Sequence, residues 1–212
     1  MSGSFVSPEL RTRVRGLAEP IGRGLARLGL SPNAITVIGF GIACLAAIAA
    51  GAQAWFVAGL LVIFGGVFDM FDGMVARATG KVSKAGAFMD STFDRWGEAV
   101  VYVGIVFGCI AAGFDLAAVL AAAAMAAAFM VSYTRARAES LGFAPGKGMA
   151  NVGFAPREVR LVILTVGLLW AGLAGGSTAL ALEITLGLLA VLATVTTIQR
   201  IVVTLNQASH EG

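Results

Sequence analysis

The chain has 212 residues, of which 58% are hydrophobic and only 13% are charged. Soluble domains are about half apolar and about one quarter charged, so this composition excludes an ordinary soluble protein and indicates an integral membrane protein. The formal net charge of +3 gives no signature of nucleic-acid binding, and its distribution along the chain is more informative than its size.

The first predicted element is an amphipathic helix over residues 8–27, where arginines interleave with apolar residues at intervals of three or four. This pattern is typical of a helix lying in the headgroup plane; a solvated basic arm is the alternative. Six apolar segments follow, each long enough to cross a hydrocarbon core of roughly 30 Å as a helix. Their predicted limits are 33–51, 54–78, 86–112, 115–140, 157–175 and 178–204. We therefore expect one all-α membrane domain over residues 1–212.

The basic residues predict how these spans are oriented. All 15 Lys and Arg fall in the N-terminal arm, in the stretches 77–95 and 135–160, or at Arg200. The short connections near residues 52, 113 and 176 carry none. By the positive-inside rule, we expect a multi-pass protein of the inner cell membrane with both termini and both long loops in the cytoplasm.

Four aspartates stand near the cytoplasmic ends of the second and third spans, at Asp69, Asp72, Asp90 and Asp94. Their pattern is D-x2-D-G-x2-A-R-x8-G-x3-D-x3-D. A carboxylate inside a membrane-spanning helix costs roughly 2.5–3.5 kcal/mol on insertion scales. Spacings of three and four place each pair on one helical face. Because the loop between them returns the chain, we expect the two pairs to face each other.

Four carboxylates this close repel one another in a low dielectric, so a positive group must lie among them. The only histidine, His210, is in the tail, so histidine cannot ligate a metal ion among the aspartates. Carboxylate oxygens together with substrate phosphates suit Mg²⁺. Two such ions are a common device at a phosphoryl centre. Gly73, Ala76 and Gly86 leave space beside the acids, and Arg77 supplies a cation for a phosphate. These residues predict a site for a diphosphate and its metal ions.

Two other interpretations of the acids stay open from the residues alone. The carboxylates of a purely structural hairpin would pair with the nearby Arg77 and Arg95, although the four aspartates and Glu98 outnumber these two. Intramembrane acids also mark the ion path of carriers. The carrier interpretation is the weaker one, because the acids cluster in one place and no further acids continue a path.

The stretch from Asp69 to Asp94 resembles the signature of the CDP-alcohol phosphotransferases, membrane enzymes with a six-span layout similar to the one predicted here. The matching positions are Asp69, Asp72, Gly73, Ala76, Arg77, Gly86, Asp90 and Asp94. A pattern of this length is specific. The resemblance implies that an alcohol hydroxyl attacks the lipid-side phosphorus of a CDP-diacylglycerol-like lipid, so that CMP leaves. It also implies a homodimer.

The resemblance assigns roles to individual residues. The four aspartates would hold two Mg²⁺ ions, with Mn²⁺ as the alternative, and Asp94 would also take the proton from the attacking hydroxyl, which is sensible work for a carboxylate. Gly73, Arg77 and Ser83 would contact the CDP group, and the start of the first span is similar to the family's nucleotide-side element. The expected CDP-lipid residues are Pro32, Asn33, Ala34, Ile35, Gly73, Ala76, Arg77 and Ser83.

The acceptor is predicted from the segment 132–139, which resembles the end of the fourth span in phosphatidylinositol phosphate synthases. Because arginine clusters suit an acceptor that itself carries a phosphate, we expect Arg135, Arg157 and Arg160 to bind the phosphate of an inositol phosphate. Contact with anionic headgroups is the alternative for these arginines. The alternative functions are the same chemistry with glycerol phosphate, serine or another polyol phosphate, and, in a different class, a cation-coupled carrier.

Overall fold

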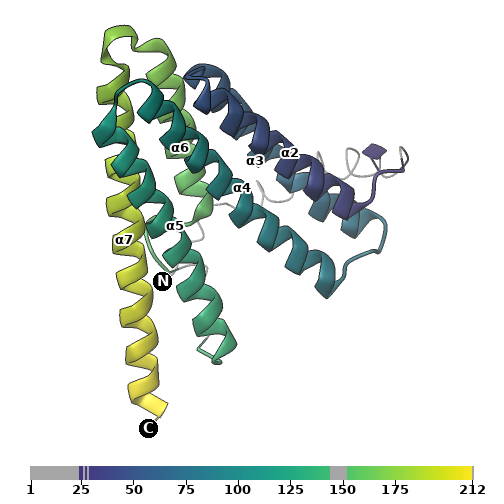
Figure 1. The fold of residues 1–212 in the computed structure, drawn as a ribbon. Coiled ribbons are helices and arrows are strands. Elements are labelled where there is room, and N and C mark those ends of the chain that lie inside the picture. The colour runs from purple at the N-terminus through teal and green to yellow at the C-terminus, as the bar shows by residue number, and fades with distance from the viewer. Residues whose placement is uncertain (1–23, 26, 28, 144–151, 212) are drawn as a thin grey trace, which may run out of the picture.

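The computed structural model of the chain describes residues 24–25, 27, 29–143 and 152–211. Most of the predicted interfacial helix over 8–27 lies outside these residues. The described part of the chain contains helices and turns and no strand (Figure 1). The elements are α2 (Pro32–Gly51), α3 (Trp55–Ala78), α4 (Lys84–Ala111), α5 (Asp115–Ser140), α6 (Arg157–Leu173), the short 3-10 helix η2 (Gly175–Ser177) and α7 (Thr178–Glu211).

The helices form where the six apolar segments predicted them. The first five agree with the predicted limits to within two residues, whereas α7 continues to Glu211 instead of ending at 204. Within the described residues, four helical stretches are long and apolar enough to cross a membrane: Pro32–Gly51, Trp55–Arg77, Asp115–Ser140 and Gly175–Ser209. Large apolar side chains such as Ile48, Phe107 and Leu173 are exposed on the outside of the bundle. The chain is therefore a multi-pass membrane protein.

Serine caps begin the two helices that start beside the aspartates. The Ser31 hydroxyl accepts the Ala34 N–H at 3.1 Å, with Pro32 in the first turn of α2. The Ser83 hydroxyl accepts the Gly86 N–H at 3.0 Å at the start of α4. Both are standard ways to satisfy free N–H groups of a first turn. Since residues 79–83 form the whole connection, the end of α3 lies near the start of α4.

The principal contacts join the six long helices into a ring in the order α2, α3, α6, α7, α5 and α4. The helices linked by short connections, α2–α3, α4–α5 and α6–α7, are neighbours in this ring. In the described part of the chain, α2 contacts both α3 and α4, and it lies between them. The helices α3 and α4 therefore do not pack against each other along their lengths. This separation leaves space between α2, α3, α4 and α6, and the candidate site occupies it.

Far from the aspartates, the bundle is packed main chain against main chain. A Cβ atom on Gly104 of α4 would collide with the backbone of Ala47 on α2. A Cβ atom on Gly108 would collide in the same way with the carbonyl oxygen of Ala50. Small residues allow this approach where lipid supplies little drive for helix association. We call this part of the molecule the closed end, and the part that holds the aspartates the charged end.

Candidate active site

The four aspartates line two adjoining pockets at the charged end. Asp69 and Asp94 line the inner pocket, which lies between α2, α3, α4 and α6. Asp72 and Asp90 line the outer pocket, which α2, α3, the 79–83 loop and α4 enclose. Thr36 of α2 lines both pockets. The acids therefore face one another across the space between α3 and α4, as the sequence predicts, but as two pairs.

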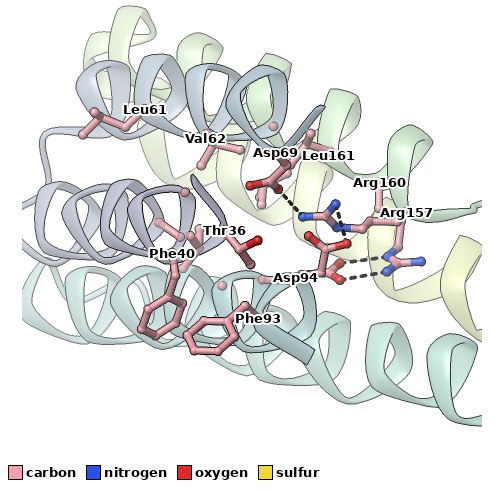
Figure 2. A pocket seen from close by; sticks show the side chains of 18 residues that line it. Thr36, Phe40, Leu61, Val62, Asp69, Phe93, Asp94, Arg157, Arg160 and Leu161 are labelled. Atoms are coloured by element: carbon pink, nitrogen blue, oxygen red, sulfur yellow. Dashed lines mark hydrogen bonds and ion pairs between the residues drawn. The ribbon is translucent and has the colours of Figure 1, made fainter. Parts of the chain in front are cut away.

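Arg157, from the first turn of α6, reaches between the two acids of the inner pocket (Figure 2). Its Nη2 lies 2.8 Å from Asp69 Oδ2, and its Nη1 lies 2.9 Å from Asp94 Oδ2. The three side chains are only 25%, 22% and 17% exposed, in that order. The buried Nε of Arg157 has no hydrogen-bond partner among the described residues. One guanidinium thus supplies the positive charge that joins α3, α4 and α6.

Arg160, one helical turn further along α6, makes a second ion pair behind the first. Its Nε and Nη2 lie 3.0 and 2.9 Å from the two carboxylate oxygens of Glu98, and its Nη1 donates to the Ala155 carbonyl at 3.0 Å. The Arg160 side chain is 2% exposed. A forked, charge-assisted pair of this kind is strong and directional. This pair fixes the start of α6 against α4, and it therefore fixes the backbone position from which the Arg157 side chain extends.

The rest of the inner pocket is apolar. Leu61 and Val62 of α3 and Leu164 of α6 line it toward the bundle interior. Phe40 and Phe93 line it on the α2–α4 side, with ring centroids 5.2 Å apart and planes at 83°. The pocket therefore changes from charged to apolar along its length, which suits a ligand with a polar group and an apolar body.

The outer pocket is polar and carries both signs of charge. The Thr36 hydroxyl donates to Asp72 Oδ2 at 2.9 Å, so α2 orients this carboxylate. Arg77 folds back over Gly73: its Nη1 is 3.3 Å from where a Cβ on that glycine would be. Lys81, from the loop, lines the same pocket. Two cations beside two carboxylates can hold a phosphorylated ligand together with a positive ion.

Asp90 connects the two pockets electrostatically. It lies close enough to Asp72 and to Asp94 for repulsion, and Asp69 repels Asp94 in turn. Within the described residues, no three acidic, histidine or cysteine side chains surround a common point. The oxygen-only ligand set nevertheless fits a hard divalent cation. Arg157 shows that a positive group is accommodated between Asp69 and Asp94.

Residues 29–205, most of the chain, match the CDP-alcohol phosphatidyltransferase family. The chain belongs to this family. It is 37% identical over 193 residues to an archaetidylinositol phosphate synthase of Pyrococcus horikoshii, covering 91% of this chain and 93% of that protein. It is 34% identical over 190 residues to a phosphatidylinositol phosphate synthase of Cutibacterium acnes, with coverages of 86% and 89%.

Solved structures of the family share this fold. The crystal structure of a phosphatidylinositol phosphate synthase from Mycobacterium tuberculosis with CDP-DAG bound superimposes with a TM-score of 0.76 at 30% identity, covering 88% of this chain and 92% of that one. The same enzyme in complex with manganese and citrate also gives a TM-score of 0.76 at 30% identity, with coverages of 89% and 88%. The six-helix ring is therefore the scaffold of a phosphatidyltransferase.

Most residues that the family resemblance assigns to the CDP-lipid come together in the outer pocket: Pro32, Asn33, Gly73, Ala76, Arg77 and Ser83. Ala34 and Ile35 are not among its lining residues in the described structure. Ala34 contributes its N–H to the helix cap, and Ile35 is fully buried. These two positions hold the start of α2 in place and do not face the pocket.

The three arginines expected at an acceptor phosphate have different surroundings. Arg157 lines the inner pocket with one nitrogen unpaired among the described residues. Arg160 also lines it, but its guanidinium is engaged by Glu98. Among the described residues, Arg135 lines neither pocket, and its Nε lies 3.0 Å from Glu139 on the exposed side of α5. Of the three, Arg157 is best placed to meet a substrate.

Sequence reasoning placed Thr36 only at the end of the nucleotide-side element and assigned no site role to Lys81. Thr36 is a polar residue inside an apolar segment, three residues after Asn33, and this position was the signal available for it. Lys81 stands in the loop between the two aspartate pairs, where its charge was visible but its direction was not. Both line the outer pocket.

Proposed function

We propose that this phosphatidyltransferase transfers the phosphatidyl group of a CDP-diacylglycerol-like lipid to an inositol phosphate and releases CMP. The observation that carries the proposal is the joining of the two pockets at the aspartates, with the predicted nucleotide residues in one and Arg157 in the other. The names of the relatives from Pyrococcus horikoshii and Cutibacterium acnes support an inositol phosphate as acceptor.

Asp69, Asp72, Asp90 and Asp94 are the proposed ligands of two divalent ions, Mg²⁺ or Mn²⁺. The manganese complex of the Mycobacterium tuberculosis enzyme supports a divalent metal. When bound, such ions neutralise a diphosphate and stabilise charge that develops at phosphorus. The chain's own contribution is to keep these carboxylates on opposing helix faces and to orient Asp72 through Thr36.

Asp94 is the proposed general base. It lies on the inner pocket, close to Asp90 of the outer pocket, so it stands where an acceptor and a CDP-lipid would meet. It takes the proton of the acceptor hydroxyl while the new oxygen–phosphorus bond forms and the bond from that phosphorus to CMP breaks. Arg77, with Lys81, would hold the phosphates of the CDP group, and Arg157 the phosphate of the acceptor.

Arg135 and Arg160 take part less directly in this proposal. Arg160 would position Arg157 through its ion pair with Glu98. Arg135 would attract the anionic acceptor from the exposed surface of α5. Pro32 and Asn33 would border the nucleotide, with Gly73, Ala76 and Ser83 opposite them.

We also propose that the chain is a single domain that crosses the inner membrane six times, with both termini and the active site in the cytoplasm. The positions of the basic residues support this orientation. α6 has only 17 residues, and α4 carries charged residues in its first turns. In the ring, each of these two helices lies between two helices that are long and apolar enough to cross a membrane, which supports a spanning position for both. We further propose that residues 8–27 form an interfacial helix and that two copies of the chain form a homodimer. Membrane lipids would contact both the helix and the dimer.

The test is CMP release by the purified protein from CDP-diacylglycerol with Mg²⁺ or Mn²⁺ and a panel of alcohols. We expect release that depends on inositol phosphate and exceeds release with inositol, glycerol phosphate or serine. Release that depends on another alcohol would replace the acceptor and keep the reaction. No release with any alcohol, together with cation flux in liposomes, would replace the enzyme by a carrier.

A further inference from the structure

Arg157 occupies the position where the proposed function places a divalent cation. Its guanidinium bridges one carboxylate from α3 and one from α4, at 2.8 and 2.9 Å (Figure 2). Asp69 and Asp94 are two of the four proposed metal ligands. The guanidinium hydrogen-bonds Asp69 Oδ2 and forms an ion pair with Asp94 Oδ2, so it fills with positive charge the space between the two oxygens that a metal ion would need.

Arg157 is equally the best-placed side chain for an acceptor phosphate, and the two tasks compete for its single positive charge. Nη1 and Nη2 each point to a carboxylate, which leaves Nε as the nitrogen without a partner among the described residues. A forked contact with a phosphate needs two parallel N–H groups of one guanidinium. Three N–H groups are left, Nε–H among them, but a phosphate that binds them lies beside both carboxylates, and their negative charge opposes its binding until Arg157 releases at least one of the two aspartates.

The backbone that carries Arg157 is held firmly, so the release has to be a side-chain movement. Arg160, three residues on, is fixed to Glu98 and to the Ala155 carbonyl. Gly66 of α3 packs so closely on Leu161 of α6 that a Cβ would collide. The long arginine side chain can rotate while α6 stays in place.

We propose that Arg157 is a place-holding cation: it neutralises Asp69 and Asp94 in the metal-free protein, and divalent metal displaces it toward the phosphate of the acceptor. The inference rests on the proposed function and adds an order to it, in which metal binding precedes and strengthens acceptor binding. By linkage, acceptor binding must strengthen metal binding by the same factor.

The first experiment measures Mn²⁺ affinity of the detergent-purified full chain with neither lipid nor alcohol present. Arg157→Gln removes the competitor and is expected to bind Mn²⁺ about tenfold more tightly than wild type, within the usual range of coupling energies. Arg157→Lys keeps the charge but loses the fork, so it should fall between the two. Gel filtration checks that each variant is folded.

Arg95→Gln is the matched control, because Arg95 carries the same charge beside the same site. Its Nη1 is 4.0 Å from Asp94 Oδ2, and it makes no bridge to Asp69 in the described structure. We expect Arg95→Gln to change the Mn²⁺ affinity much less than Arg157→Gln. Equal gains in both variants would reduce the effect to a general field and overturn the place-holding role. Unchanged or weaker affinity in Arg157→Gln would overturn it as well.

The second experiment measures binding of inositol phosphate to wild-type protein with and without Mn²⁺. Binding is expected only with the ion, or about tenfold more tightly with it, and Arg157→Gln should lose this dependence. Equal binding in both conditions would overturn the proposed order. Because the Mn²⁺ titration uses no substrate, it can succeed while the CMP assay fails, so failure of the proposed function is distinguishable from failure of this inference.

Discussion

The closed end and the charged end of the bundle are built from the same helices by opposite means. At the closed end, α2 and α4 touch through their main chains at Gly104 and Gly108. At the charged end, the space between α3 and α4 contains two pockets and two arginine–carboxylate groups. Close main-chain packing at the closed end thus accompanies an open charged end, where the carboxylates line pockets and can contact a ligand.

The largest expected effect comes from removing the proposed base at the charged end. We expect Asp94→Asn to lower CMP release by about 10²–10⁴-fold, because the acceptor hydroxyl loses its proton acceptor. Binding of CDP-diacylglycerol, measured separately, should be largely retained. The matched control is Asp115→Asn at the closed end, exposed at the start of α5, which should leave activity unchanged. Loss of CDP-lipid binding in Asp94→Asn would make Asp94 a metal ligand only.

The next effect concerns stability at the charged end. Glu98→Ala leaves the guanidinium of Arg160 buried without its carboxylate, so we expect a loss of about 3–5 kcal/mol in the free energy of unfolding. Denaturant titration in detergent measures this loss. Glu139→Ala breaks the exposed pair with Arg135 and should cost at most about 1 kcal/mol. Similar losses in both variants would show that burial does not distinguish the two pairs.

A smaller effect is expected from overpacking the closed end. Gly104→Ala forces a methyl group against the backbone of Ala47, so we expect a loss of about 1–3 kcal/mol. Gly41→Ala, on the exposed side of α2, meets no described atom within 4 Å and should stabilise the helix by roughly 0.5–1 kcal/mol. Thermal unfolding of the two variants checks this, and equal melting temperatures would show that the close contact is dispensable.

The smallest effect is expected from Gly39→Ala at the charged end, which should lower activity more than stability. A Cβ atom on Gly39 would lie 2.5 Å from Asp69 Oδ1, so Gly39→Ala displaces a carboxylate instead of a main chain. We expect about a tenfold loss of CMP release, because a displaced ligand misplaces the reacting groups. The loss of stability should be smaller than that of Gly104→Ala. A variant with full activity would show that Asp69 tolerates the shift.

Local pattern predicted much of this molecule. Apolar length and helix-start signals predicted all six long helices, and the three- and four-residue spacings predicted that the aspartate pairs face each other. Six of the residues that the family resemblance assigns to the CDP-lipid line the outer pocket, and their contact with that lipid stays a prediction. Each of these inferences uses residues that are close in sequence or share one helix.

The ion pairs of α6 were beyond such reasoning. Sequence distance suggested Arg77 and Arg95 as partners for the acids. Arg95 reaches Asp94 only at 4.0 Å, whereas the close ion pairs, at 2.8–2.9 Å, are with Arg157 and Arg160. These contacts depend on α6 lying against α3, and no local periodicity encodes that choice of neighbour. Arg200 shows the same limit: it is 3% exposed and its Nε donates to the Val152 carbonyl at 3.0 Å, a contact between distant segments that no local pattern indicates.

The position of Arg157 in the chain has a consequence for biogenesis. The ribosome completes Asp94 before Arg157, and the interval is 157 − 94 = 63 residues. At about 5–20 residues per second, the nascent chain carries its acids for roughly 3–13 s before the neutralising side chain is made. During this time the carboxylates of α3 and α4 lack the ion pairs that they form with α6 in the folded protein. The synthesis of α6 is then the step that neutralises Asp69 and Asp94 in the nascent protein.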